Sequence, residues 1–264
     1  MAAPTLGGIV IGFVLLLGVF RLVERSRPRA LCQPILRPGF STDVAYWALT
    51  PYVTHYVGGV AVVLLLAPVA LAIHGSVDEA TILAGYGPLS RLPYAAQGVL
   101  MLVVGDLMGY WVHRLFHGRR LWRFHAVHHS STALDWLASV RMHPVNEALS
   151  RAAITLPLVA VGFAPAAAVW IGPIFALFGL LLHANVDWDF GRLRRVVASP
   201  RFHRWHHADD RDVAPCNFAG LFPAWDILFG TYFMPEGRVP ERFGTATPVP
   251  DGLAAQLAFP FRQR

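Results

Sequence analysis

The sequence contains little charge, no lysine and almost no cysteine. Only 14% of its 264 residues are charged, whereas 55% are hydrophobic and the mean hydropathy is +0.47, which exceeds what the core of a soluble domain of this size requires. The two cysteines, Cys32 and Cys216, lie far apart and form no C-x-x-C pair, which excludes a disulfide framework and a zinc ribbon. The composition therefore predicts that the bilayer is part of the solvent of this chain.

The basic residues are all arginine, and most of them lie in short segments beside long apolar stretches. A sequence pI near 9.9 is compatible with nucleic-acid binding, but this placement favours lipid headgroups and membrane topology. We therefore expect a membrane protein with no nucleic-acid partner.

Four stretches without arginine approach or exceed the roughly 20 apolar residues that a spanning helix needs. We predict membrane spans at about residues 4–20, 53–73 and 92–112, and a helical hairpin at 152–182. The last stretch is too long for one crossing, and proline and glycine interrupt it. We expect it to enter the membrane and turn back near Gly162 to Pro165.

The arginines are distributed unevenly around these stretches. Residues 1–5 contain none, whereas arginines are dense after the first and third stretches. These are Arg21, Arg25, Arg27, Arg29 and Arg37, then Arg114, Arg119, Arg120 and Arg123. The positive-inside rule places the N-terminus outside and these segments in the cytoplasm. The first stretch lacks the basic start of a cleavable signal peptide, so we expect a retained anchor.

Eight of the twelve histidines fall in three tight groups. They are His113 and His117, then His125, His128 and His129, then His203, His206 and His207. Offsets of three and four residues put side chains on one face of a helix, so each group can present several imidazoles to one point. Gly118 is placed to end the first helix, and Ser199-Pro200 is typical of a helix start.

Imidazole suits zinc, copper, iron and nickel, so the spacing alone does not name the metal. A zinc protease would need H-E-x-x-H, but residues 114–116 are Arg, Leu and Phe. A histidine-rich membrane metal transporter remains an alternative, although its ligands should lie near the middle of the membrane. Ordinary hydrogen-bonded histidines are a weaker alternative, because eight of them would have to recur at ligand spacing without a common cause.

Four motifs extend this pattern: G-D-L-M-G-Y-W-V-H-R-L-F-H at 105–117, H-A-V-H-H-S at 125–130, S-P-R-F-H-R-W-H-H at 199–207 and D-I-L-F-G-T-Y-F at 226–233. Together they resemble the fatty acid hydroxylase and sterol desaturase superfamily of membrane di-iron oxygenases, over residues 105–235. The resemblance implies two Fe ions, O2 as co-substrate and electrons from a separate cytochrome or ferredoxin-type donor. It also adds His143 and His183 to the candidate ligands.

Ten candidate ligands exceed the needs of one tetrahedral site, which favours two metals. They are His113, His117, His125, His128, His129, His143, His183, His203, His206 and His207. Metal-bound imidazoles usually donate their other N–H to an acceptor. Asp106, two helical turns before His113, and Asp187, four residues after His183, are the candidates for this role. The motif R-M-H-P-V-N-E spaces Glu147 one residue further from its histidine than the family pattern does.

The expected fold class is all-α: one integral membrane domain over residues 1–264, polytopic and helical, with a cytoplasmic helical cap that carries a histidine-rich dimetal site. The expected function is hydroxylation, or desaturation, of a lipid C–H bond. A sterol or hopanoid, a fatty acyl lipid, a carotenoid and an ether lipid all remain open as substrates.

Overall fold

The computed structural model describes residues 3–29, 33–210 and 212–262, and these ranges contain helices and no β-strand. The long helices are α1 (Leu6–Ser26), α2 (Phe40–His74), α5 (Tyr94–Phe116), α7 (Pro144–Ala160) and α8 (Pro165–His183). The short ones are α3 (Glu79–Ala84), α4 (Gly87–Ser90), α6 (Trp122–His129), α9 (Pro200–His206), α10 (Ala224–Leu228) and α11 (Leu253–Arg262), with 3-10 turns η1 (Trp136–Val140) and η2 (Gly191–Leu193). The all-α class that the sequence predicts is confirmed.

Three helices of the described part are long and apolar enough to cross a membrane: α1, α5 and α8. The outer face of α1 leaves Leu6, Leu15 and Leu22 more than 60% exposed, which suits lipid rather than water. The stretch 53–73 lies within α2, but several of its side chains fall outside the described residues, and its role as a span stays a prediction.

The stretch expected to form a hairpin consists of α7 and α8, joined by residues 161–164. Both helices pack against α5, where Leu158 and Ile171 meet Met101 in one apolar cluster. The joining turn rests on the segment before α4, because the Tyr86 N–H donates to the carbonyl of Gly162 at 3.2 Å. Residues 152–182 therefore form two helices that share α5 as their support.

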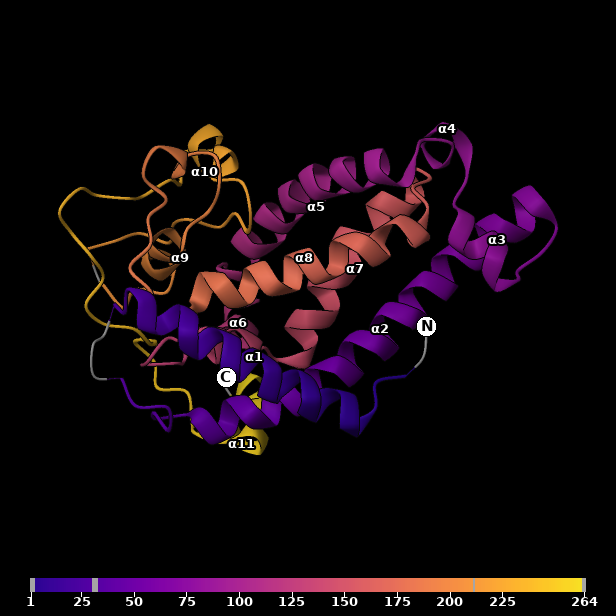
Figure 1. Cartoon of the computed structure of the whole chain (residues 1–264). Helices are drawn as coiled ribbons and strands as arrows, with labels where there is room; N and C mark the ends of the chain where they lie inside the picture. The colour runs from indigo at the N-terminus through magenta and orange to yellow at the C-terminus, as the bar shows by residue number, and fades with distance from the viewer. Residues whose placement is uncertain (1–2, 30–32, 211, 263–264) are drawn as a thin grey trace.

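The cap gathers at one end of the long helices (Figure 1), where α5 and α8 end beside α6, α9 and α10, while α3 and α4 lie at the other end. Helix α5 ends at Phe116, and the N–H of Gly118 donates back to Leu115 at 2.9 Å. Helix α11 packs on α6, where Phe259 meets Ala126 and Val127. Chain segments far apart in the sequence thus meet where the apolar helices end.

We predict that Gly162→Ala destabilises the protein. Gly162 has φ +97, and a Cβ there would lie 2.1 Å from the carbonyl oxygen of Tyr86. A left-handed conformation costs a non-glycine residue about 1–2 kcal/mol even without such a clash, so the unfolding temperature in detergent should fall by several degrees. Gly172→Ala is the matched control, because that helical position is open and alanine is the better helix former. Equal unfolding temperatures for the two variants would contradict this account of the turn.

Candidate metal centre

Nine of the ten predicted histidines come together near the C-terminal ends of α5 and α8. They form two groups, in each of which one ring nitrogen per residue lies within 4.8 Å of all the others. The first group is His113, His117, His125, His129 and His206, and the second is His128, His183, His203 and His207. The groups adjoin, since the ring centroids of His129 and His207 are 4.3 Å apart.

Local helix chemistry explains how the histidines arrive there. His113 lies in the last turn of α5 and His117 caps it, and His183 is the last residue of α8. Helix α9 begins as its sequence predicts: Ser199 is the N-cap, its hydroxyl accepts from the Phe202 N–H at 3.2 Å, and proline follows. The start of α9 fixes its phase, so that its three histidines fall within two turns.

Five imidazoles hold a protein acceptor on Nδ1. His113 pairs with the carbonyl of Phe218 at 2.8 Å, His206 with Cys216 at 2.7 Å, His128 with Arg141 at 3.0 Å and His183 with Gly179 at 2.8 Å. The fifth, His125, pairs at 2.8 Å with the side-chain oxygen of Asn146, whose amide nitrogen donates to Ser150. A carbonyl can only accept, so each of these rings carries its proton on Nδ1 and a lone pair on Nε2.

The Nε2 lone pairs face one another across short distances. His113 and His125 approach to 3.1 Å through Nε2, and His128 and His183 approach to 3.2 Å. Since all four carry their proton on Nδ1, no hydrogen bond can join these atoms, and the contacts are repulsive without a shared cation. Nε2 of His117 and of His206 is buried with no partner among the described residues. Both groups therefore fit metal ions, and imidazole suits iron and zinc alike.

Burial keeps the cap histidines neutral. It lowers the pKa of His125, His128 and His129 in α6, and of His203, His206 and His207 in and after α9, well below the usual value, and the neighbouring imidazoles lower each pKa further. Neutral imidazole is the form that binds a metal. These side chains are therefore ready to coordinate at neutral pH.

Asp106 supports the site differently from the sequence prediction. Within the described residues, His113 and Asp106 form no hydrogen bond with each other. The Asp106 carboxylate accepts instead from the backbone N–H groups of Gly220, Leu221 and Phe222 at 2.8 to 3.0 Å. A Cβ on Gly220 would lie 3.1 Å from that carboxylate. Asp106 thus ties α5 to the loop that carries Phe218, the acceptor of His113.

Two further candidates lie away from the cluster. Asp187 pairs with Arg201 at 2.9 Å, whereas His183 uses Gly179. His143 caps α7: its Nδ1 accepts from the Val145 N–H, and its Nε2 lies 3.2 Å from the carbonyl of Leu257. With both nitrogens engaged outside the two groups, its position does not favour the ligand role that the resemblance implies.

Sequence reasoning missed three residues that build the site. Asp226 accepts from the N–H groups of Phe218 and Ala219 and from the hydroxyl of Thr231, and Asn217 adopts φ 57 while bonding Phe202 and Phe233. Asp226 is the first residue of the motif at 226–233, so that motif was the sequence signal that could have identified it. Asn146, the partner of His125, lies in R-M-H-P-V-N-E, but nothing in the spacing of that motif distinguishes it from a surface asparagine.

Comparison with known proteins gives a consistent result. The family model described as fatty acid hydroxylase matches residues 98–231, about half of the chain. An ornithine lipid hydroxylase from Rhizobium tropici is 37% identical over 65% of this chain and 52% of its own length. An alkylglycerol monooxygenase from Danio rerio is 33% identical over 50% of this chain and 29% of its own length.

A methylsterol monooxygenase from Arabidopsis thaliana is 27% identical over 64% of this chain and 57% of its own length. The chain thus spans about half or less of the length of the first two of these relatives. No solved structure matches.

We predict that the metal-free protein loses stability as the pH falls below 6.5, the usual histidine pKa. The unfolded chain takes up protons there, while the buried imidazoles, with lowered pKa values, do not, so acid favours unfolding. The unfolding temperature of chelator-treated protein in detergent should therefore be lower at pH 5.5 than at pH 7.5. Replacing His128 and His207 by asparagine should flatten the dependence. A midpoint that does not change with pH would show that these histidines are not buried in the neutral form.

Proposed function

Because this chain belongs to the fatty acid hydroxylase family, we propose that it is a membrane-bound di-iron oxygenase that uses O2 and external electrons to hydroxylate a C–H bond of a lipid. The observation that carries this proposal is the pair of adjoining histidine groups with converging Nε2 lone pairs. Two metal ions side by side, held only by imidazole, are suited to reductive activation of O2, which one tetrahedral structural ion is not.

In this proposal the protein's own groups have distinct tasks. The nine histidines hold the two irons, which supply the redox chemistry with O2 when bound. Five of these rings are kept in one tautomer by acceptors on the protein. The acceptors are the backbone carbonyls of Phe218, Cys216, Arg141 and Gly179 and the side-chain oxygen of Asn146. Seven of the nine histidines are buried, which would exclude water that competes for the metals.

The substrate class is proposed as a polar membrane lipid, with hydroxylation of its apolar chain. Support comes from the ornithine lipid hydroxylase and alkylglycerol monooxygenase among the relatives, and from a centre that lies at the ends of apolar helices exposed to lipid. A sterol substrate is the second candidate, because a methylsterol monooxygenase aligns over 64% of the chain. Desaturation would use the same site, but its product would have lost two hydrogens instead of gaining one oxygen.

A separate electron donor completes the proposal. The sequence contains no c-type haem motif, no glycine fingerprint for a dinucleotide and no cysteine set for an iron–sulfur cluster. We therefore propose a cytochrome or ferredoxin-type partner that approaches the cap from the cytoplasm. The transporter alternative is disfavoured, because the two groups lie at helix ends rather than in the middle of an apolar helix.

The decisive test combines metal content with product analysis. Protein purified anaerobically should contain about two irons per chain, and lipids from cells that express it should gain one oxygen relative to cells that lack it. His113→Ala, His128→Ala and His203→Ala each remove a nitrogen donor, so product should fall to background. His55→Ala, on α2 outside both groups, should remain active at matched expression. Near-normal product from two of the three variants would refute the proposed function.

The proposed orientation is tested by labelling exposed positions on the two sides. In a background with Cys32 and Cys216 replaced by alanine, Val77→Cys between α2 and α3 should react with an impermeant maleimide added outside right-side-out vesicles. Arg120→Cys, between α5 and α6, should react only after permeabilisation, as the arginine distribution requires. Detergent-solubilised samples, in which both cysteines should react, are the control. Labelling of both from one side of intact vesicles would contradict a cytoplasmic centre.

A further inference from the structure

The Nδ1 acceptors of the two histidine groups lie mainly on two loops. In the first group, His113 and His206 bond carbonyls of residues 216–218. In the second group, His128 bonds the carbonyl of Arg141, at the end of segment 130–141. Neither segment is a long helix, although the second contains the short 3-10 turn η1, so the position of each acceptor depends strongly on what anchors its segment.

Buried carboxylates anchor the first loop, 216–222. Asp106, from α5, accepts from three of its backbone N–H groups, and Asp226, from α10, accepts from two more. Both aspartates are at least 97% buried. Every backbone N–H from Phe218 to Phe222 is therefore held by a carboxylate, which fixes the Phe218 carbonyl toward His113.

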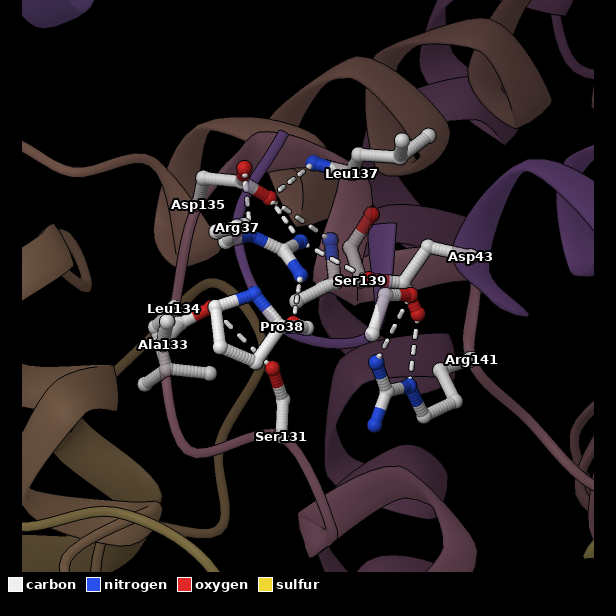
Figure 2. Close-up of polar contacts among 12 residues, drawn as sticks. Arg37, Pro38, Asp43, Ser131, Ala133, Leu134, Asp135, Leu137, Ser139 and Arg141 are labelled. Atoms are coloured by element: carbon white, nitrogen blue, oxygen red, sulfur yellow. Dashed lines mark hydrogen bonds and ion pairs between the residues drawn. The ribbon is translucent and has the colours of Figure 1, made fainter. Parts of the chain in front are cut away.

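An ionic quartet anchors the second segment (Figure 2). Arg37 lies between Asp135 and Asp43, donating to Asp135 through Nε at 2.6 Å and to Asp43 through Nη2 at 2.7 Å. The second oxygen of Asp43 accepts from Nε of Arg141 at 2.5 Å. The side chains of Arg37 and Asp43 are fully buried and that of Arg141 is 3% exposed. The two positive and two negative charges balance, as a buried cluster requires.

The remaining donors of the quartet bind the chain on both sides. Asp135 caps η1 by accepting from the N–H groups of Leu137 and Ala138. Arg141 reaches Ser130 at 3.1 Å and the carbonyl of Gly39 at 3.2 Å. Gly39 has φ +81, and a Cβ there would lie 2.2 Å from Nη2 of Arg141. Both ends of segment 130–141 are thus fixed to the start of α2.

The second group depends on this anchor more than the first group depends on any one contact. Nδ1 of His203 and Nδ1 of His207 are buried without a partner among the described residues, so only His128 and His183 are oriented through Nδ1. The acceptor of His183 belongs to its own helix. Within the described residues, His128 is therefore the ring of this group whose Nδ1 is held by a segment outside its own helix.

We propose that Asp43, with Arg37, is a positioning residue for the second metal: it holds Arg141, whose carbonyl sets the orientation of His128, while Asp106 and Asp226 do the same for the first metal through a separate loop. Arg37 and Asp43 lie outside residues 98–231, which match the family. The inference requires the metal binding of the proposed function but no particular substrate or reaction.

Site-selective loss of metal tests the proposal. Purified chelator-treated protein is dialysed against limiting free Co²⁺, and the tightly bound equivalents per chain are measured; wild type should retain two. Asp43→Asn should retain one, since loss of an outer partner of a ligand costs about 10- to 100-fold in metal affinity. Asp210→Asn is the matched control, because its partly exposed carboxylate lies 3.8 Å from Arg238 and accepts from the Asp212 N–H, with no bond to segment 130–141 among the described residues. This variant should retain two.

Combining Asp43→Asn with the loss of one histidine identifies which of the two metal sites the aspartate supports. His203 and His125 are central in their groups, each within 3.2 Å of two other ring nitrogens. Asp43→Asn combined with His203→Ala should still retain one equivalent, because both changes act on the second site. Asp43→Asn combined with His125→Ala should retain none. Asp226→Asn should give the reverse pattern.

A gentler variant covers the case in which Asp43→Asn does not fold, since it unbalances a buried cluster. Arg141→Lys keeps all four charges but cannot reach Asp43, Ser130 and Gly39 together, so Co²⁺ affinity should fall about tenfold at the second site only. Two equivalents with wild-type affinity in the folded variants, or loss at the first site, would overturn the proposal. A wild type that cannot hold two metals would instead overturn the proposed function, and this inference with it.

Discussion

The metal centre depends on where the imidazole rings carry their protons. A histidine offers a lone pair to a metal only if its other nitrogen keeps the hydrogen, and a carbonyl opposite Nδ1 enforces that choice. Five of the nine rings have such a partner, four of them a backbone carbonyl. A backbone acceptor is only as fixed as its chain segment, so the surrounding architecture serves to immobilise short loops beside the helix ends.

Buried aspartates immobilise these loops more strongly than apolar contacts would. A carboxylate that accepts several N–H bonds fixes direction as well as distance, and these bonds are strong because the acceptor is charged. Burying that charge is costly without full satisfaction. Asp106 and Asp226 receive backbone N–H groups, whereas Asp43 and Asp135 receive guanidinium groups. The first arrangement links α5 to the loop before α10, and the second links the start of α2 to η1.

The sequence predicted what is local and missed what depends on tertiary contact. Spacing of three and four residues placed His203, His206 and His207 on one helix, because that periodicity belongs to the helix itself. It could not show that His128 joins a different group from His125 and His129, because the grouping depends on where tertiary packing brings His183 and the histidines of α9. Asp106 was singled out because it lies two helical turns before His113, but its partners lie 114 to 116 residues away. Asp43 gave no signal, since Arg141 is 98 residues distant.

The use of carbonyls rather than carboxylates beside the imidazoles has an electrostatic consequence. The two groups contain only histidines among the described residues. The aspartates reach them through an intervening peptide, so no carboxylate of that part of the chain bonds to a ring. Metal ions held by neutral ligands keep their full positive charge in a site of low dielectric, and each further positive charge is opposed by Coulomb repulsion from the neighbouring ion. If the two groups hold the iron ions proposed above, such a site would favour their divalent over their trivalent state. An O2-dependent oxygenase would have to regain the divalent state in every cycle.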